Sequence, residues 1–205
     1  MNLSHKNRCK IQHLLLDWYS RAKRNLPWRQ TSNPYNILLS EFMLQQTQVA
    51  TVIPYYNRFL EKFPTIQSLA VAPRADVLKT WEGLGYYARA HNLHRTAQEI
   101  VERFNSMIPT TYDNLSSLPG FGPYTTAAVL SIAFNQNHAV LDGNVTRVLC
   151  RLFGIEEFVS NIQVKNHLWE LARLLLPKEN AGKYNQAIME LGALICTPKS
   201  PDCTV

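Results

Sequence analysis

Apolar residues recur at intervals of three and four along almost the whole chain, and proline or glycine separates one apolar run from the next. This spacing is typical of amphipathic helices, and nearly every segment fits it. The pattern therefore predicts an all-α fold. Pro54 falls inside one predicted helix and should kink or restart it. The predicted helices span residues 10–23, 36–49, 48–62, 65–71, 74–81, 124–134, 163–176 and 182–195, with others that end near Phe104 and begin after Asp142.

The helix predicted over 36–49 carries a single carboxylate, Glu41, among apolar neighbours. Asn33 can cap this helix, and Pro34 suits its first position. Ionising an acid in apolar surroundings is costly, so the pKa of Glu41 should rise and make it a candidate proton donor near neutral pH. A solvated Glu at the helix edge, or one paired with Arg, is the competing interpretation. The polar residues 45–48 suit a ligand with several donors and acceptors, such as a nucleobase.

Two glycines precede a pair of tyrosines in the segment Gly83-Leu84-Gly85-Tyr86-Tyr87, which leads into a basic helix. The glycines allow a tight turn with exposed rings. Tyr86 and Tyr87 are then either ordinary core aromatics or include one ring that wedges into a base stack. Spacing alone leaves both interpretations open.

The most specific binding pattern is the segment 118–125 (LPGFGPYT), which small residues follow. Gly120 and Gly122 let the backbone turn sharply between two helices. The second helix would then present free N–H groups and its positive dipole end to a phosphate. The pattern resembles the helix–hairpin–helix element of DNA repair enzymes, which holds a DNA backbone without reading its sequence.

Three further features allow more than one interpretation. Asp142 precedes a predicted helix, where it either caps that helix or, if Asn144 is the cap, faces a cleft. On spacing alone, Arg29 reads as a surface ion-pair residue rather than a ligand contact. Cys196 and Cys203 are spaced like the start of a metal or cluster loop, although two cysteines alone do not make a site.

Length and charge narrow the class of protein. The 205 residues suffice for one large domain or two small, interlocked ones. The 21 Lys and Arg outnumber the 15 Asp and Glu, and the net charge of +6 favours a polyanionic partner, nucleic acid before an anionic membrane. No apolar run is long enough to span a bilayer and the N-terminus lacks a signal core, so we expect an intracellular protein. Four cysteines in a reducing compartment argue against a disulfide scaffold.

Five motifs together resemble one family, the A/G-specific adenine DNA glycosylases of the endonuclease III superfamily. The motifs are residues 41–49 (EFMLQQTQV), 83–87 (GLGYY), 118–125 (LPGFGPYT), 141–145 (LDGNV) and 191–196 (LGALIC). The resemblance covers the chain from about Leu16 to Cys203, and the first and fourth motifs are the most specific to the family.

The resemblance implies a two-lobed helix–hairpin–helix glycosylase fold with the active site in the cleft between the lobes. One implied lobe is a six-helix region over 30–135, with the hairpin at 114–133. The other combines residues 1–29 and 136–205, whose helices lead into a truncated iron–sulfur loop.

The resemblance also implies roles for two acids. The family removes adenine mispaired with 8-oxoguanine or guanine after flipping it out of the duplex. Glu41 matches the acid that protonates adenine at N7. Asp142 matches the carboxylate that stabilises the resulting oxocarbenium, either electrostatically or through a transient covalent bond. Asn144 and Tyr124 match polar residues that position this pair.

Other matched residues contact the nucleic acid in the family. They are Gln46 and Tyr86, inserted into the duplex around the lesion pair; Leu44 and Thr47, neighbours of 8-oxoguanine; Arg29, which lines the adenine pocket; and the hairpin glycines Gly120 and Gly122.

The implied activity is monofunctional. Tyr124 stands where strand-cutting relatives carry a Schiff-base lysine, so little or no lyase activity is expected. Tyrosine here also resembles the mismatch thymine glycosylases, but Glu41 favours adenine because purine departure profits from acid catalysis. The alternatives are a G/T-mismatch thymine glycosylase and a truncated, non-catalytic DNA-binding fragment. The expected partner is double-stranded DNA with an A:8-oxoG or A:G mispair, bound by a monomer in the cytoplasm, associated with the nucleoid.

Two family features are incomplete in this sequence. A 4Fe–4S cluster is expected from the resemblance, with ligands spaced Cys-x6-Cys-x2-Cys-x5-Cys. Cys196 and Cys203 match the first two, and the third would fall immediately after Val205. Two ligands do not hold such a cluster stably. The family's C-terminal domain, which recognises 8-oxoguanine, has no counterpart, so weaker lesion discrimination is expected. Cys9 and Cys150 match no cluster position and read as ordinary thiols, with Cys150 buried.

Overall fold

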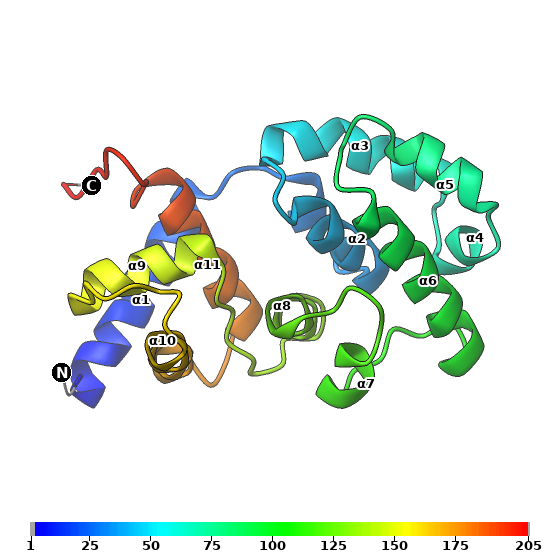
Figure 1. Cartoon of the computed structure of the whole chain (residues 1–205). Coiled ribbons are helices and arrows are strands. Elements are labelled where there is room, and N and C mark those ends of the chain that lie inside the picture. The colour runs from blue at the N-terminus through cyan, green and yellow to red at the C-terminus, as the bar shows by residue number, and fades with distance from the viewer. Residues whose placement is uncertain (1–2, 205) are drawn as a thin grey trace. The chain divides into compact units, whose positions relative to one another are not determined.

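The fold was examined in a computed structural model, which describes residues 3–204. Over this range the chain forms eleven α-helices and one 3-10 turn, with no strand (Figure 1). The prediction of an all-α fold is therefore confirmed. Within the same range no helix combines the length and the apolar character needed to cross a membrane.

The elements follow one another with short connections. In chain order they are α1 (His5–Ala22), the 3-10 turn η1 (Pro27–Arg29), α2 (Pro34–Leu44), α3 (Val49–Lys62), α4 (Ile66–Ala70), α5 (Arg74–Trp81), α6 (Ala88–Arg103), α7 (Tyr112–Ser116), α8 (Pro123–Phe134), α9 (Gly143–Phe153), α10 (Ile162–Leu175) and α11 (Ala181–Leu194).

The chain forms two compact units. The central unit is Asn25–Val129, and the terminal unit combines the chain up to Arg24 with the chain from Leu130 onward. The boundary falls within α8, so the first part of this helix belongs to the central unit and the last part to the terminal unit.

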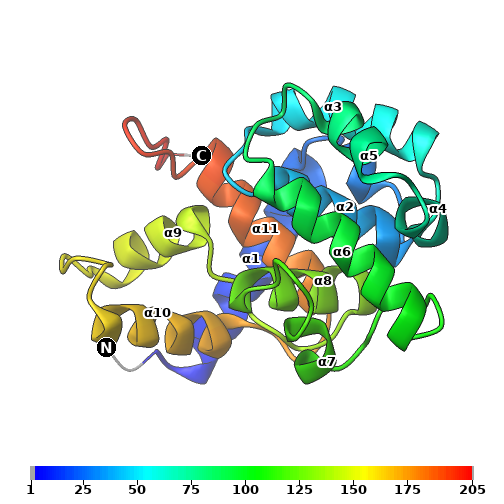
Figure 2. The same cartoon turned by 45° about the vertical axis from the view of Figure 1, so that its right-hand side comes forward.

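Helix α6 organises the central unit. Helices α4 and α5 pack against it, α2 packs against both α6 and α3, and α3 continues the layer to α5 (Figures 1 and 2). The interior is mostly apolar, as the helical spacing predicts, although polar residues such as Glu41 and Arg89 are also buried in this unit. Its most deeply buried side chains are Leu38, Leu39, Phe42, Met43, Phe59, Leu69, Trp81, Leu93, Ile100 and Leu115.

In the terminal unit α11 packs against α1 and α9, and α10 packs against the same two helices. Helix α11 also carries a buried charge, Glu190, whose side chain is 1% exposed. Arg24 forms an ion pair with Glu190. Its Nη2 donates to Glu190 Oε2 at 2.6 Å and its Nε donates to Glu190 Oε1 at 3.0 Å. A buried carboxylate needs such a partner, because an uncompensated charge in the interior is strongly destabilising.

The end of α2 differs from expectation. The helix predicted over 36–49 begins at Pro34, after the Asn33 cap, and stops at Leu44. The chain turns immediately afterwards, because Gln46 has a φ of +56°, which no helical residue adopts. The polar residues after Leu44 therefore form a turn rather than the last part of the helix.

Helix α3 was expected to kink or restart at Pro54, and it does not restart, because one helix runs from Val49 to Lys62. Proline removes one backbone donor, yet α3 buries Val52 and Phe59 on one face. We attribute the continuity of the helix to this packing, which supplies most helical stability in proteins.

Candidate active site

Glu41 lies in the last turn of α2, in the central unit. The helix starts where the Asn33 side chain accepts a hydrogen bond from the Tyr35 N–H at 2.9 Å. Further along, the Glu41 side chain is only 5% exposed, between the fully buried side chains of Leu38 and Phe42. The interpretation of Glu41 as a solvated edge residue is therefore wrong, and the acid is buried.

A polar turn follows the end of the Glu41 helix directly. Gln46 is exposed at its tip, with a left-handed backbone, while Leu44 and Thr47 on either side are half-buried. Gln45 Nε2 donates to Thr125 Oγ1 at 3.2 Å, which ties the turn to α8. We call residues 45–47 the Gln46 turn.

A second exposed turn precedes α6. Gly83, Gly85 and Tyr86 have φ values of +92°, +76° and +49°, so three of its residues are left-handed. The Tyr86 side chain is 60% exposed and is not a core aromatic. We call residues 83–86 the Tyr86 turn.

One side chain that the sequence did not single out connects these two turns. Arg89, near the start of α6, is 6% exposed and donates to backbone carbonyls of both turns. Burial lowers the pKa of its guanidinium. No local pattern distinguishes this arginine from the other basic residues of α6, because its acceptors in α2 and the Gln46 turn lie more than forty residues earlier in the chain.

The hairpin between α7 and α8 packs on the helix of Glu41. The rings of Phe42 and Phe121 lie edge to face, with centroids 5.5 Å apart. Gly120 has a φ of +80°, and a Cβ atom there would come within 2.8 Å of the Phe42 ring and 2.9 Å of Asn92 Cβ. A Cβ at Gly122 would meet nothing within 4 Å, so only the first glycine is needed for the sharp turn. Tyr124, on the first turn of α8, is half-buried.

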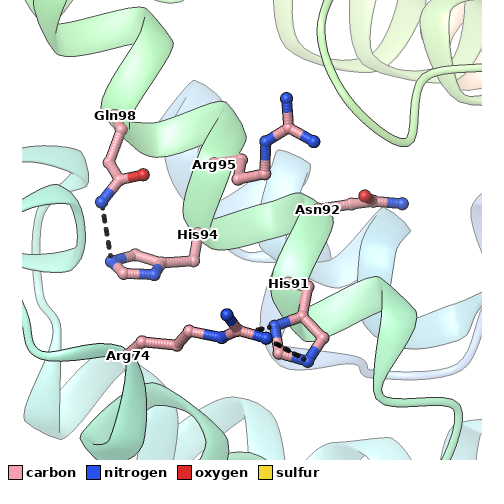
Figure 3. A pocket seen from close by; sticks show the side chains of 6 residues that line it. All are labelled: Arg74, His91, Asn92, His94, Arg95 and Gln98. Atoms are coloured by element: carbon pink, nitrogen blue, oxygen red, sulfur yellow. Dashed lines mark hydrogen bonds between the residues drawn. The ribbon is translucent and has the colours of Figure 1, made fainter.

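A basic pocket of about 420 Å³ lies along α6 (Figure 3). The Arg74 side chain reaches from α5 to His91, with its Nε 3.1 Å from His91 Nδ1, and Gln98 faces His94. All of the lining residues are basic or neutral, which suits an anion. They are Arg74, His91, Asn92, His94, Arg95 and Gln98.

Asp142 caps α9 in the terminal unit. Its Oδ1 accepts from the Val145 N–H at 2.7 Å, and its Oδ2 accepts from Asn144 Nδ2 at 3.1 Å. The capping interpretation of Asp142 is confirmed, and Asn144 supports this cap rather than replacing it. Burial raises the pKa of Asp142, while the two hydrogen bonds and the charge of Arg147 oppose that rise.

Arg147 is a second residue that the sequence did not single out. Its Nη2 donates to Asn144 Oδ1 at 2.8 Å and to the Gly192 carbonyl at 2.7 Å. A Cβ at Gly192 would lie 2.6 Å from Asn144 Cβ, so this glycine permits the close approach of α11 and α9. The Asn144 side-chain amide therefore bonds to Asp142 through its nitrogen and to Arg147 through its oxygen.

The segment after α11 carries the two predicted cluster ligands. Cys196 is half-buried and Cys203 is exposed. Arg151 Nη1 donates to Cys196 Sγ at 3.3 Å, and Arg147 Nε donates to the Cys196 carbonyl at 2.7 Å. Residues 3–204 contain no group of three or more His, Cys, Asp or Glu able to hold a metal. Cys196 and Cys203 are two of the four cluster ligands that the resemblance implies.

The two remaining thiols and Arg29 complete the set of residues singled out from the sequence. Cys9 is exposed. Cys150 was expected to be buried but is half-buried, and burial raises the pKa of its thiol. Arg29 ends η1 and is half-buried beside the buried Trp28.

The predicted site residues fall into two groups. In the central unit, hydrogen bonds and ring contacts join the end of the Glu41 helix to the Gln46 turn, the Tyr86 turn and the hairpin. In the terminal unit, Asp142 and Asn144 bond to each other, and Arg147 joins Asn144 to Cys196.

Comparison with known proteins gives one family match and several close relatives. The family model described as "HhH-GPD superfamily base excision DNA repair protein" matches residues 39–174. A protein named "Adenine DNA glycosylase" from Buchnera aphidicola subsp. Schizaphis graminum (strain Sg) is 44% identical over 95% of this chain and 56% of its own length. The "Adenine DNA glycosylase" of Rattus norvegicus is 47% identical over 92% of this chain and 38% of its own length. The chain thus spans about half the length, or less, of these relatives.

Among solved structures, the chain is similar to "a thermostable thymine-DNA glycosylase". The TM-score is 0.89 at 29% sequence identity, and the match covers 99% of this chain and 94% of that one. This likeness extends over both the central and the terminal unit.

Proposed function

The chain belongs to the HhH-GPD superfamily of base excision DNA repair proteins, and we propose that within this superfamily it is an adenine DNA glycosylase. The proposed substrate is adenine mispaired with 8-oxoguanine or guanine in double-stranded DNA. The observation that carries the proposal is Glu41: an acid 5% exposed, one turn before an exposed polar turn. The names of the relatives support the choice of adenine.

In the proposed reaction Glu41 donates its proton to N7 of a flipped adenine. The bond between the base nitrogen and the sugar carbon then breaks, and its electron pair leaves with the protonated base. The sugar is left as an oxocarbenium ion, to which water adds with release of a proton. The products are adenine and an abasic sugar, as in other glycoside hydrolyses that use two carboxyl groups.

Asp142 has the properties that this scheme requires of the second carboxylate. The hydrogen bonds from Val145 and Asn144 fix its direction and favour the ionised form against burial. A carboxylate held in this way can stabilise the oxocarbenium without itself being consumed. We propose that Asp142 and Glu41 act on the same nucleotide, with Asn144 and Tyr124 positioning them.

Contacts to the rest of the DNA follow from the exposed features of the central unit. Gln46 and Tyr86 project from strained turns and would insert into the duplex around the mispair. Leu44 and Thr47 would contact 8-oxoguanine, and Arg29 would line the adenine pocket. The hairpin around Gly120 and Gly122 and the basic pocket on α6 would meet phosphates, which carry no base information but hold the register.

The identity of residue 124 bears on whether the DNA strand is cut after the base is released. A β-lyase needs a lysine that forms a Schiff base with the sugar, and a tyrosine hydroxyl cannot do so. The proposed enzyme therefore releases the base and leaves the strand intact. A protein with this substrate would act on chromosomal DNA in the cytoplasm, in association with the nucleoid, and as a monomer.

A thymine glycosylase acting on G:T mispairs is the second candidate. It is favoured by the likeness to a thymine-DNA glycosylase over almost the full length of both chains. The buried Glu41 argues for adenine instead, because thymine offers no N7 to protonate.

Single-turnover base release from a duplex panel tests the proposal. The panel holds A:8-oxoG, A:G, T:G and A:T pairs in one sequence, and strands are analysed before and after alkali. We expect release of adenine from the first two duplexes and strand breaks only after alkali. Faster release from T:G would establish the thymine alternative. Tight binding to all four duplexes without base release would establish a non-catalytic DNA-binding protein.

A further inference from the structure

The guanidinium of Arg89 donates hydrogen bonds to five backbone carbonyls of the central unit. Its Nη1 donates to the carbonyls of Phe42 at 3.2 Å, Met43 at 2.6 Å and Gln45. Its Nη2 donates to Thr47 Oγ1 at 2.9 Å, to the Leu84 carbonyl at 3.4 Å and to the Gly85 carbonyl at 3.2 Å. Nη1 thus bonds to carbonyls at and just after the end of α2, and Nη2 bonds to both the Gln46 turn and the Tyr86 turn.

The first set of acceptors lies at the end of the Glu41 helix. The last carbonyls of an α-helix have no partner within the helix and carry its negative dipole end. A cation placed there fixes where the helix stops. Because Phe42 and Met43 directly follow Glu41, Arg89 also fixes the backbone next to the proposed acid.

The second set of acceptors fixes two strained turns. Gln46 and Tyr86 both have positive φ without being glycine, and such residues persist only where their surroundings hold them. Arg89 lies next to each: it bonds to Gln45 and Thr47 on either side of Gln46, and its Cζ lies 5.3 Å from the Tyr86 ring centroid. Trp81 completes the support, since its Nε1 donates to the Gly85 carbonyl at 3.0 Å.

Lysine does not reproduce this arrangement. An ammonium group is a compact point charge, whereas the planar guanidinium presents two nitrogens in a fixed fork. Only the fork can bond to the end of α2 and to both turns from a single position.

We infer that Arg89 is a positioning residue that couples the Gln46 turn to the Tyr86 turn, so that both side chains enter DNA as one rigid unit. The inference rests on the proposed function for the identity of the substrate. It predicts that loss of the fork impairs insertion and base flipping while leaving the phosphate contacts of the hairpin in place.

The test compares Arg89→Lys with Arg58→Lys, the same change at an exposed residue of the central unit whose Nη2 donates to the Thr80 carbonyl. Affinity for an undamaged duplex measures phosphate contacts, and fluorescence of 2-aminopurine beside the mispair measures unstacking in the bound state. For Arg89→Lys we expect undamaged-duplex affinity within about twofold of the unmodified chain. We expect loss of the unstacking signal and at least about a tenfold slower release of adenine, since small misplacements are costly in catalysis. Arg58→Lys should leave all three quantities unchanged.

A double-mutant cycle separates coupling from a general loss of stability. In a background carrying Gln46→Ala and Tyr86→Ala, Arg89→Lys should slow base release by less than about twofold further. The two side chains through which Arg89 is inferred to act are absent from that background. A purely structural role predicts the same slowing in both backgrounds, and that result would overturn the inference. So would an Arg89→Lys variant that unstacks 2-aminopurine as well as the unmodified chain.

The two proposals fail in different ways. If the unmodified chain unstacks 2-aminopurine but releases no adenine, the proposed function is wrong, and the fluorescence comparison still decides the role of Arg89. If the chain releases adenine and Arg89→Lys behaves like Arg58→Lys, only the role of Arg89 is wrong.

Discussion

At the residue scale, Asp142 is both the cap of α9 and the proposed stabiliser of positive charge. Its pKa is raised because burial outweighs the hydrogen bonds from Val145 and Asn144 and the nearby charge of Arg147. The folded state therefore keeps the Asp142 proton to a higher pH than the unfolded chain does. By linkage, ionisation of Asp142 lowers the free energy of unfolding as pH rises above the ordinary aspartate pKa of about 3.9.

This sign gives a prediction for Asp142→Asn, which keeps a capping oxygen but cannot ionise. The melting temperature of the variant minus that of the unmodified chain should increase from pH 3 to pH 7, because only the unmodified chain bears the cost of a buried charge. Thermal melts across that range check the prediction. A difference that is flat, or that decreases with pH, would mean that the carboxylate is better stabilised in the fold than in water.

Gly120 gives a second prediction at this scale. A Cβ there meets Phe42 and Asn92 at under 3.0 Å, and the φ of +80° is costly for any side chain. We expect Gly120→Ala to lower the free energy of unfolding by about 1–3 kcal/mol. The matched control is Gly122→Ala in the same loop, where a Cβ meets nothing, so its unfolding curve should overlay that of the unmodified chain. Equal stability of both variants in urea would contradict the geometry of the hairpin.

Sequence reasoning succeeds for residues whose role is local. The Asn33 cap, the Asp142 cap and the burial of Glu41 each follow from a few neighbouring positions. It fails for Arg89 and Arg147, because each also bonds to partners more than forty positions away in the chain. The spacing of apolar residues does not indicate that an arginine is buried and bonds to carbonyls far away in the chain.

At the element scale, phosphate binding in the basic pocket of α6 can be tested separately from the insertion of the Gln46 and Tyr86 turns into DNA. Arg74 and Arg95 line it, and no lining residue is acidic. If phosphates occupy this pocket, each lost contact lowers the salt dependence of duplex affinity by about one unit of log–log slope.

The double variant Arg74→Ala with Arg95→Ala should therefore weaken binding to any duplex and reduce the slope by about one to two. Arg103→Ala is the matched control: it lies on the same helix, outside the pocket, and pairs with Glu99 at 2.7 Å. Titrations between 50 and 200 mM salt check the prediction. An unchanged slope in the double variant would show that no phosphate occupies the pocket.

The ends of the elements were harder to predict than their existence. The helical spacing located every helix of the central unit, but it placed the end of α2 at residue 49 instead of Leu44. The true end depends on the left-handed Gln46 and on the Arg89 cation, neither of which periodicity reports. The restart that Pro54 predicted within α3 does not occur, and we attribute the continuity of the helix to its packing.

At the scale of the whole molecule, the chain has two cores, and each proposed catalytic acid belongs to a different one. Glu41 depends on the helices around α6, and Asp142 depends on α9 and the close approach of α11 at Gly192. The helical spacing predicted the all-α class, which the structure confirms, and the net charge predicts a nucleic-acid partner. The proposal that Glu41 and Asp142 act on one nucleotide came from the resemblance of motifs to a known family. The spacing of apolar residues within one helix does not report which residues of the other unit it works with.

The central claim is that Glu41 supplies the proton that releases adenine. Its most direct test is single-turnover release of adenine opposite 8-oxoguanine by Glu41→Gln, with Glu61→Gln as the matched control on the exposed face of α3. We expect the first change to slow release by about 10²–10⁴-fold, as loss of a general acid does, and the second to leave the rate unchanged. A Glu41→Gln variant that releases adenine at the rate of the unmodified chain would contradict the account.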